Sequence, residues 1–359
     1  MKNEKLNKIL ITGNEAIAEG AIQAGCRFFA GYPITPQNEI PAYMSKRMPE
    51  VGGVFIQSES ELAAISMVMG AAATGERAIT TSSSPGISLK QEGISYIAGA
   101  ELPAVIVNIM RAGPGLGNIW PAQSDYFQAT KGGGHGDYHN IVLAPSSVQE
   151  CFDLTLSAFD LADKYRNPVM ILGDGMLGQM MEPIQTKGHR PHTKGPRSKN
   201  QKPWAVTGCA GRAPNLVASF RMAEGEMEKH NIHLKNKYDE IEEKEQRFEV
   251  FYTDEAEIII VAYGTMARIA KGAVKNLRAK NKKIGLIRPI TLWPFPKKAF
   301  AQSPRPNTQY LVVEMSNGQM VEDVQLAVGG RCPVEFYGRT GGGIPSEEEI
   351  TKIIYGKDV

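Results

Sequence analysis

The sequence predicts an α/β protein with two domains, each built on a doubly wound parallel sheet. Short apolar segments alternate with helical segments along most of the chain, which is the pattern of strands joined by crossover helices. The apolar segments carry few charges and little alternation, as expected of strands with both faces covered. The length of 359 residues suits two domains. We place the first domain at residues 1–182, a linker and helical connector at 183–248, and a C-terminal α/β domain at 249–359.

Composition narrows the class of protein. With 42% hydrophobic and 22% charged residues, the chain is typical of globular proteins. The net charge of +2 gives no field that would attract nucleic acid or an acidic membrane surface. No apolar run approaches the roughly 20 residues of a membrane span, and the charged N-terminus lacks a signal-peptide core. We therefore expect a cytoplasmic protein with neither a nucleic-acid nor a membrane partner.

The cysteines lie far apart in the sequence and form no Cys-x-x-Cys pair. This spacing is typical of reduced cytoplasmic thiols and argues against a zinc or iron–sulfur site held by this chain alone. The four residues are Cys26, Cys151, Cys209 and Cys332.

The first domain is predicted to alternate helices and strands from the N-terminus. Thr12 or Asn14 is expected to cap the first helix, and glycine-rich or polar turns separate the later elements. Helices are expected near 15–23, 59–75, 87–98 and 147–165, and strands near 27–30, 54–56, 77–81, 104–109, 140–143 and 168–172.

The connector and the second domain follow. Residues 188–203 are basic, contain proline and lack apolar periodicity, which is typical of a linker, whereas 215–248 are charged and helical in pattern. A stiff, proline-rich connection is expected at 288–296. Strands are expected near 257–262, 283–287, 310–314 and 334–336, and helices near 266–278, 320–328 and 347–354.

The first candidate site is the loop Tyr32-Pro33-Ile34-Thr35-Pro36, which follows a predicted strand. Its two prolines fix the backbone and disfavour a strand or helix across it. A rigid loop at the carboxyl end of a strand is well placed to present a hydroxyl and carbonyl groups to a ligand. The alternative is a plain turn in which Thr35 caps a helix that starts at Pro36.

The second candidate is an acidic residue in the segment 55–75, which is predicted to pass from a short strand into a helix of small residues. Ser58 is the expected N-cap, with Glu59 and Glu61 in the first turn, where the helix dipole favours carboxylates. A carboxylate at this junction lies at the carboxyl end of a sheet, where open α/β folds bind ligands. The alternative is that both acids only complement the dipole.

The third candidate combines a polar turn with an arginine. Residues 82–86 lead into a helix and offer hydroxyl and amide groups to a polar or anionic ligand. Arg111 follows a buried strand, where its guanidinium could pair with a substrate carboxylate, although a surface arginine in a loop is the alternative. The glycines that follow form no dinucleotide fingerprint, because no strand–GxGxxG–helix order surrounds them.

The loop from Lys131 to His139 is not interpreted as a metal site. Its glycines argue against a helix that would bring His135 and His139 together, and no pattern of carboxylates or cysteines completes a ligand shell. We expect a mobile loop that closes over a substrate.

Taken together, the candidate motifs resemble the pyrimidine-binding domain of the 2-oxoacid:ferredoxin oxidoreductases, and the C-terminal stretches resemble the transketolase C-terminal-like domain of the same alpha-type subunit. Within that family, the 2-oxoisovalerate (branched-chain) and 2-oxoglutarate enzymes are the most similar. The matching motifs are Tyr32–Pro36, Glu61 with Gly70, Thr81–Ser83 with Gly86, Arg111, Gly264–Met266 and Val313–Gln319.

The resemblance implies a role for each candidate residue. Glu61 would bind the aminopyrimidine of thiamine diphosphate and favour the tautomer that removes the thiazolium proton. Glu61 is preferred to Glu59 because the family's glutamate precedes its glycine by nine positions, as Glu61 precedes Gly70. Thr35 and Arg111 would hold the substrate carboxylate. The backbone contacts to the pyrimidine would come from Tyr32, Pro33, Ile34 and Thr35.

The resemblance also implies a multi-subunit enzyme that converts a 2-oxoacid and coenzyme A to acyl-CoA and carbon dioxide and reduces ferredoxin. Thiamine diphosphate would be shared with a partner subunit that binds its diphosphate and Mg²⁺. A gamma-type subunit and a ferredoxin-like subunit with [4Fe-4S] clusters would complete the complex. Gly173-Asp174-Gly175 with Asn200 has the spacing of the magnesium motif of thiamine enzymes, but Asn200 lies in the linker, so we interpret the match as chance and expect no metal on this chain.

The identity of the 2-oxoacid is less constrained by the sequence. The apolar run 117–121 could line a pocket and favours a branched-chain or aromatic substrate. A 2-oxoglutarate enzyme would need a second cation, for which Lys131, His135 and His139 are candidates. Three rival functions remain: a 2-oxoglutarate-specific enzyme of the same family, a non-oxidative thiamine-dependent decarboxylase subunit, and a non-catalytic scaffold subunit.

Overall fold

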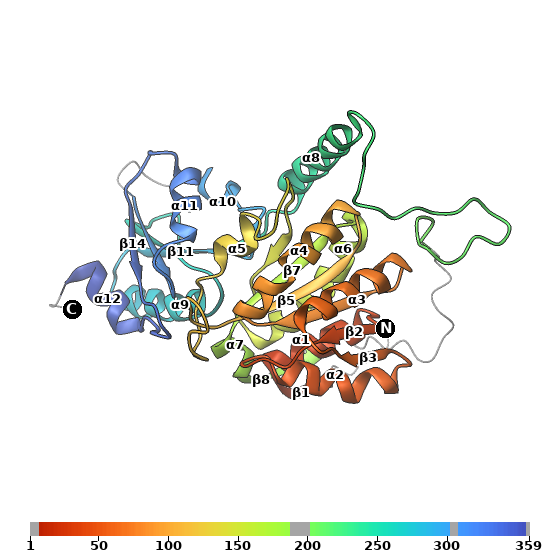
Figure 1. The fold of residues 1–359 in the computed structure, drawn as a ribbon. Coiled ribbons are helices and arrows are strands. Elements are labelled where there is room, and N and C mark those ends of the chain that lie inside the picture. Colours follow the sequence, from red (N-terminus) through yellow and green to blue (C-terminus); the bar gives the residue numbers. More distant parts are fainter. Residues whose placement is uncertain (1–6, 187–201, 302–307, 357–359) are drawn as a thin grey trace, which may run out of the picture.

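Residues 7–186, 202–301 and 308–356 are described by the computed structural model. They form a seven-stranded sheet, a five-stranded sheet and a two-stranded ribbon, with helices packed on both sheets (Figure 1). The α/β class with two largely parallel sheets confirms the prediction. Within these ranges, no helix combines the length and the apolar character that a membrane span requires.

The seven-stranded sheet has the order β12-β6-β7-β5-β4-β2-β3, and all strands except β12 run parallel. Every parallel strand was predicted, with ends that differ by at most two residues. They are β2 (Phe28–Gly31), β3 (Val54–Gln57), β4 (Ala78–Ser82), β5 (Ala104–Met110), β6 (Ile141–Leu143) and β7 (Pro168–Asp174).

Helices cover both faces of this sheet. Helices α4 and α6 both contact β5 and β7, and α1 packs on α2 and α6 whereas α3 packs on α4. Thr12 caps α1 through a capping box, so of the two candidate caps, Thr12 and Asn14, it is the first that caps the helix. The helices of this domain are α1 (Gly13–Gln23), α2 (Glu39–Glu50), α3 (Glu61–Ala73), α4 (Ser84–Gly99), the short α5 (Tyr126–Thr130), α6 (Val148–Tyr165) and the short α7 (Gly175–Gln179).

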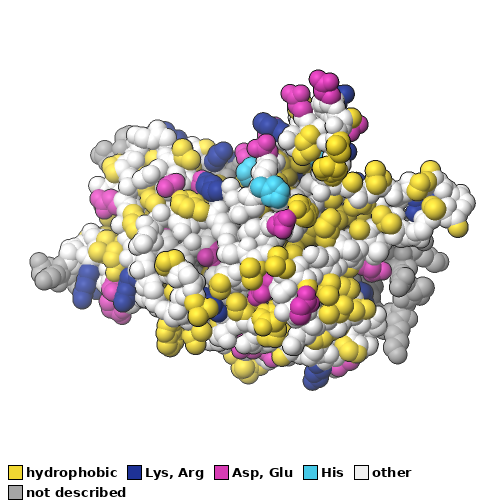
Figure 2. Space-filling model, in the orientation of Figure 1, with side chains coloured by type: hydrophobic (Ala, Val, Ile, Leu, Met, Phe, Trp, Pro, Cys, Tyr) yellow, Lys and Arg dark blue, Asp and Glu magenta, His cyan; other side chains and the backbone are white. Residues whose placement is uncertain are grey.

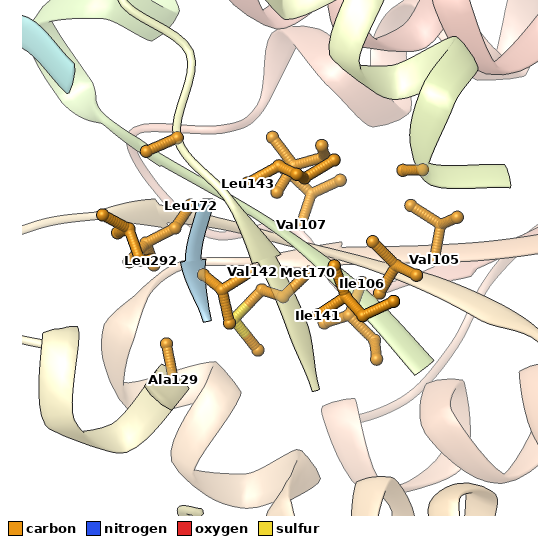
Figure 3. Close-up of a cluster of buried hydrophobic side chains, with 14 of the residues drawn as sticks. Val105, Ile106, Val107, Ala129, Ile141, Val142, Leu143, Met170, Leu172 and Leu292 are labelled. Atoms are coloured by element: carbon orange, nitrogen blue, oxygen red, sulfur yellow. The ribbon is translucent and has the colours of Figure 1, made fainter. Parts of the chain in front are cut away.

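The core of the sheet is made by branched and aliphatic side chains from its central strands. Figure 3 shows Val105 and Val107 of β5, Val142 and Leu143 of β6, and Leu172 of β7, the strand that lies between β5 and β6. All five side chains are fully buried. This continuous apolar pattern is what a sheet covered on both faces requires, and it explains why these strands were found from the sequence.

The five-stranded sheet of the C-terminal part has the order β14-β13-β10-β11-β9, with β9 antiparallel to β11. Helix α9 packs on β11 and on α12. The strands are β9 (Phe248–Phe251), β10 (Ile258–Val261), β11 (Ile284–Pro289), β13 (Gln309–Glu314) and β14 (Val334–Gly338). The helices are α8 (Glu226–Lys244) of the connector, α9 (Gly264–Ala279), α10 (Lys298–Ala301), α11 (Met320–Val328) and α12 (Glu347–Tyr355).

Four strands were not predicted, and one of them is β9, the antiparallel strand of the five-stranded sheet. β1 (Asn7–Thr12) and β8 (Met181–Thr186) pair antiparallel as a separate ribbon. β12 (Thr291–Trp293) lies within the stretch expected to be a plain connection, yet it pairs antiparallel with β6 and so forms the edge of the first sheet. The second part of the chain therefore completes the sheet of the first part. Most of the predicted linker 188–203 lies outside the described residues.

Two caps considered from the sequence, Ser58 and Thr35, are not found in the structure. Ser58 does not cap α3, because its N–H donates to the Gly31 carbonyl oxygen (2.9 Å) and extends the pairing of β3 with β2. Ser60 is the cap, so Glu59 precedes the helix and only Glu61 lies in its first turn. No helix starts at Pro36, because α2 begins at Glu39.

Candidate active site

The carboxyl ends of neighbouring strands bring the predicted motifs to one edge of the seven-stranded sheet. Thr35 follows β2, the Ser82–Gly86 turn follows β4, and Arg111 follows β5, while Glu61 begins α3 after β3. The Arg111 Nη1 donates to the Thr35 carbonyl oxygen (3.0 Å), and the Ser82 hydroxyl lies 3.5 Å from Glu61 Oε1. This edge is where open α/β sheets bind ligands.

The Glu61 carboxylate is buried at the start of α3, with only 5% of the residue exposed. It lies directly against Gly86 of α4, since a Cβ atom at position 86 would come within 2.5 Å of Glu61 Oε1. Among the described residues, its side chain makes one hydrogen bond, the long one from Ser82. A carboxylate has about four lone-pair sites, so Glu61 keeps acceptor capacity for a ligand.

The Arg111 guanidinium is fixed by backbone carbonyls. Nη1 donates to Thr35 O (3.0 Å) and Nη2 donates to Leu116 O (3.2 Å), and only 7% of the residue is exposed. The interpretation of a surface arginine is therefore wrong. The buried Nε has no hydrogen-bond partner among the described residues. Because buried donors in proteins are almost always paired, this N–H marks a place for an acceptor.

The loop after β2 is anchored to the neighbouring strand β4 through Gln37, and Tyr32 of this loop is exposed. The buried Gln37 amide donates to Tyr32 O (3.3 Å) and accepts from the Thr81 hydroxyl of β4 (2.6 Å). Tyr32 itself is 40% exposed. The Thr35 hydroxyl accepts a hydrogen bond from Asn38 Nδ2 (3.2 Å), so its own proton is available to a ligand.

A buried polar network that was not predicted from the sequence binds the backbone of Arg111. Ser84 Oγ donates to Asp125 Oδ2 (2.6 Å) and accepts from the Arg111 backbone N–H (3.0 Å). Asn108 Nδ2 donates to the same Asp125 oxygen (2.9 Å). Burial raises the pKa of Asp125, and the hydrogen bonds from Ser84 and Asn108 oppose that rise. Asp125 lies in an irregular loop with no local motif, so only the topology reveals this network.

A buried lysine was also missed. Lys90 of α4 is fully buried, and its Nζ donates to Thr80 Oγ1 (2.6 Å) and Thr81 O (3.2 Å) on β4. Burial lowers the pKa of Lys90 to about 7, and the negative charge of Glu61 acts in the opposite direction. Helical spacing could have identified it, because Lys90 shares the apolar face of α4. The apolar members of that face are Ile87, Ile94 and Ile97.

In the polar loop after α5, Lys131, His135 and His139 lie in three different environments. Lys131 forms an ion pair with Asp323, and the His139 ring stacks on Trp293 with centroids 4.5 Å apart. His135 is exposed. Within the described parts of the chain, no group of three or more histidine, cysteine, aspartate or glutamate residues could hold a metal ion.

The Gly173-Asp174-Gly175 motif has a structural role. Asp174 is 1% exposed and caps α7 by accepting from the N–H groups of Met176 (3.0 Å) and Leu177 (3.1 Å). Burial raises the pKa of Asp174, and the hydrogen bonds from the N–H groups of Leu177 and Met176 oppose this rise. The short helix α7 after the turn was not expected, and Asn200 lies outside the described residues.

These residues fit the pyrimidine end of thiamine diphosphate. The requirement is a buried carboxylate with free lone pairs, and Glu61 provides it because the missing side chain of Gly86 lets the carboxylate lie against α4. The exposed Tyr32 and the unpaired Arg111 Nε lie at the same edge of the sheet.

Comparison with known families matches both parts of the chain. Residues 19–249 match the thiamine-diphosphate-binding domain of pyruvate flavodoxin/ferredoxin oxidoreductases. Residues 256–350 match core domain II of pyruvate:ferredoxin oxidoreductase. The two matches cover most of the chain.

Relatives and solved structures agree with these matches. The chain is 52% identical over 349 residues to the ketoisovalerate oxidoreductase subunit VorB of Methanothermobacter marburgensis, with 96% of each chain covered. It is 39% identical to the 2-oxoglutarate synthase subunit KorA of Methanothermobacter thermautotrophicus, covering 96% of this chain and 97% of the relative. A structure of 2-oxoglutarate:ferredoxin oxidoreductase from Magnetococcus marinus, with 2-oxoglutarate, coenzyme A and succinyl-CoA bound, superposes with a TM-score of 0.85 at 27% identity. That match covers 98% of this chain, which spans 65% of the longer one.

Proposed function

The chain belongs to the 2-oxoacid:ferredoxin oxidoreductases as an alpha-type enzyme subunit, and from this membership we propose that it supplies the pyrimidine-binding half of the active site. The observation that carries the proposal is the Glu61 carboxylate, buried against Gly86 with lone pairs to spare. The assembled enzyme would convert a 2-oxoacid and coenzyme A to acyl-CoA and carbon dioxide and pass electrons to ferredoxin. The division of the chain at residues 182 and 248 is part of this proposal.

The residues at the sheet edge have separate tasks. When bound, thiamine diphosphate supplies the nucleophile and the electron sink for loss of carbon dioxide. Glu61 would hold a proton between its carboxylate and the pyrimidine ring, which requires an acceptor that is shielded from water. The backbone of Tyr32–Thr35, anchored to β4 through Gln37, would orient that ring.

The substrate carboxylate would be held by Thr35 and Arg111. The Thr35 hydroxyl has a proton to donate, and the Arg111 Nε has no partner among the described residues. The ordered guanidinium needs no rearrangement to meet an anion, because two carbonyl groups already fix its plane. Pre-organised donors of this kind bind a carboxylate with little loss of side-chain entropy.

We expect Arg111→Lys to raise the KM for the 2-oxoacid about tenfold or more in the assembled complex. Lysine lacks the planar fork and cannot bond Thr35 O, Leu116 O and a carboxylate in one plane. Steady-state kinetics with 2-oxoisovalerate and 2-oxoglutarate tests this. Because the carboxylate is common to both, the factor should be the same for both substrates, and a loss confined to one would reject this role for Arg111.

The partner subunits complete the proposal. The relatives VorB and KorA are each named as a subunit, which implies that members of the family form multi-subunit complexes. We propose a thiamine-diphosphate- and Mg²⁺-binding subunit, a gamma-type subunit and a [4Fe-4S] ferredoxin-like subunit as partners. Hydrophobic side chains gather over α3 and α4 (Figure 2), and exposed Leu62 and Leu89 on these helices support contact with a partner beside the site. The free thiols at all four cysteines support a cytoplasmic location.

The substrate is proposed to be a branched-chain 2-oxoacid. The VorB relative shares 52% identity against 39% for KorA, and Leu116 and Ile119 expose apolar side chains in the loop that follows Arg111. Of the three candidate cations for a second carboxylate, Lys131 already pairs with Asp323. A 2-oxoglutarate-specific enzyme is the second candidate, supported by KorA and by the Magnetococcus structure.

Purification of the native complex tests the proposed function. We expect the chain to co-purify with thiamine-binding and iron–sulfur subunits, to absorb in the visible range, and to reduce ferredoxin with 2-oxoisovalerate at a higher kcat/KM than with 2-oxoglutarate. A colourless preparation that releases an aldehyde without coenzyme A would instead identify a non-oxidative decarboxylase. A coloured complex that keeps full turnover without a functional Glu61 would identify this chain as a scaffold.

A further inference from the structure

Arg111 lies at the base of a loop whose two ends are paired. Its backbone forms an antiparallel β-bridge with Pro121, and the Ala112 N–H donates to Trp120 O (2.9 Å). The chain therefore leaves the sheet after Arg111 and returns beside its own starting point. Leu116 in this loop supplies one of the two carbonyl groups that fix the guanidinium. The position of Arg111 consequently depends on what holds the returning end of the loop.

The returning end is held by the C-terminal part of the chain through Gln123, which is fully buried. The Gln123 N–H donates to Met315 O (2.9 Å), and its side-chain Oε1 accepts from the Met315 N–H (3.1 Å). Its Nε2 donates to Tyr263 O (2.9 Å), and its carbonyl oxygen accepts from the Tyr263 hydroxyl (3.2 Å). Met315 follows β13 and Tyr263 lies between β10 and α9, so the loop is bound to the edge of the five-stranded sheet.

Two residues further on, Asp125 connects this anchor to Arg111. The Asp125 carboxylate accepts from Ser84 Oγ (2.6 Å), and the same Ser84 oxygen accepts from the Arg111 N–H (3.0 Å). A serine hydroxyl has one proton, and the charged carboxylate at 2.6 Å takes it in preference to the Arg111 carbonyl oxygen at 3.1 Å. Asp125 therefore orients the Ser84 hydroxyl so that its lone pairs face the Arg111 N–H.

Gln319 of the C-terminal part binds the chain on both sides of Asp125. Its Nε2 donates to Ser124 O (2.7 Å), and its Oε1 accepts from the Phe127 N–H (2.8 Å). The backbone of Gln319 is fixed in turn, because its N–H donates to the fully buried Glu314 carboxylate (3.2 Å). The place of the Asp125 carboxylate is thus set by contacts with both parts of the chain.

We propose that Gln123 and Asp125 are positioning residues for Arg111, so that the C-terminal part of the chain sets the affinity of the site for the substrate carboxylate. The contacts are properties of the fold, whereas their effect on substrate binding rests on the proposed function. Neither residue needs to touch the substrate, because Gln123 is fully buried and Asp125 acts through Ser84. The C-terminal part, to which the proposed reaction assigns no group, thereby has a task in that reaction.

A purely structural role is the competing explanation. The hydrogen bonds of Gln123 could serve only to hold the two parts of the chain together. Such a role predicts a loss of stability when the bonds are removed. It predicts neither a selective loss of affinity for the 2-oxoacid nor any dependence on the Arg111 side chain. The decisive readout is therefore the coupling between Asp125 and Arg111, which a double-mutant cycle measures.

This cycle is made in the assembled complex. We expect Asp125→Leu to raise the KM for the 2-oxoacid about fivefold or more, a size typical of residues that share a hydrogen-bond network. The physical reason is that the Ser84 hydroxyl loses its acceptor and is free to rotate away from the Arg111 N–H. The kcat should stay within about twofold, because an interaction made equally in the ground and transition states affects KM alone.

The second background completes the cycle. In Arg111→Lys, Asp125→Leu should leave the KM within about twofold of the single Arg111→Lys variant, because the guanidinium through which it acts is gone. An equal rise in KM in both backgrounds overturns the proposal.

Two further variants separate position from stability. Asp125→Asn keeps an oxygen that can accept from both Ser84 and Asn108, so the KM should stay within about twofold of the wild type. Tyr263→Phe alters only the C-terminal part and removes one hydrogen bond to the Gln123 carbonyl oxygen. We expect it to raise the KM about threefold, the usual effect of one neutral hydrogen bond. If Asp125→Leu does not fold, an unchanged KM in Tyr263→Phe overturns the proposal.

Glu150→Gln is the matched control. Glu150 of α6 accepts from both Nη atoms of Arg288 of β11 (2.7 Å each), so it also joins the two parts of the chain. It does so through α6, not through the segment that follows Arg111. Its replacement should lower the stability and leave the KM for the 2-oxoacid unchanged.

Amide hydrogen exchange reads the position of Arg111 without substrate. The Arg111 N–H is bonded to Ser84 Oγ, so its exchange should be faster in Asp125→Leu and Tyr263→Phe and unchanged in Glu150→Gln. A KM that rises in Arg111→Lys but not in Asp125→Leu rejects only the positioning role. An unchanged KM in Arg111→Lys itself rejects the proposed function of Arg111, and the use of these contacts in the reaction with it.

Discussion

Replacement of Glu61 by glutamine is expected to reduce the turnover of the assembled complex by about 10²–10⁴-fold, the usual contribution of a group that transfers a proton. Glutamine matches the shape of glutamate, so it can stay in the buried space beside Gly86 and Ser82. It cannot exchange a proton with the pyrimidine ring. The measurement is the initial rate of ferredoxin reduction with saturating 2-oxoacid and coenzyme A.

Glu59→Gln is the matched control for this prediction. Glu59 is exposed and precedes α3, so the same chemical change there should leave the rate within about twofold. The comparison also tests the choice between the two acids, which the sequence could make only from the spacing to Gly70. If Glu61→Gln keeps near-normal turnover, Glu61 is not the proton-transfer group.

Gly86→Ala is expected to give a folded chain with about 10²-fold lower activity. The new Cβ would lie 2.1 Å from Ser82 Oγ and 2.5 Å from Glu61 Oε1, and both atoms are ends of side chains that can rotate away. The fold therefore survives, while the carboxylate moves from its place. A displacement of about 1 Å in a reacting group can cost about 10²-fold in rate. Circular dichroism and turnover of the assembled complex measure the two effects.

Gly99→Ala provides the control in the same helix. At the far end of α4, the nearest neighbour of the added methyl group would be Ser219 Cβ at 3.3 Å, a much milder contact. We expect normal turnover in this variant. Equal losses in Gly86→Ala and Gly99→Ala would show that α4 tolerates no added methyl group, and would remove the argument for a specific displacement of Glu61.

The parts of the fold that the sequence revealed share one physical property. The strands of the first sheet are buried on both faces, so their apolar runs stand out wherever the chain is scanned, as at Val105–Ile109. Thr35, Glu61 and Arg111 could be placed near one another because parallel strands end at a common edge. The residues of the turns fixed the helix starts less well. Ser58 and Ser60 are both serines, a preferred N-cap residue, so the sequence could not decide which of them caps α3.

The features that escaped sequence analysis depend on contacts between distant segments. Asp125 has no role until the fold brings Ser84 and Asn108 to it. Lys90 was not singled out in the sequence, although its neighbours along α4 placed it on the buried face. β12 is only three residues long and pairs with a strand that precedes it by far in the chain. Such pairings leave no periodic signal, because the short strand gains its stability from the sheet edge.

The pairing of β12 with β6 also sets the order in which the protein can be completed. During synthesis, Ile141–Leu143 forms an open sheet edge until Thr291–Trp293 has left the ribosome. At a translation rate of about 5–20 residues per second, that edge stays bare for roughly ten seconds or more. A bare edge strand is a template for pairing with another nascent chain. A strand from the last quarter of the polypeptide thus covers the exposed edge of the sheet beside which Glu61 lies.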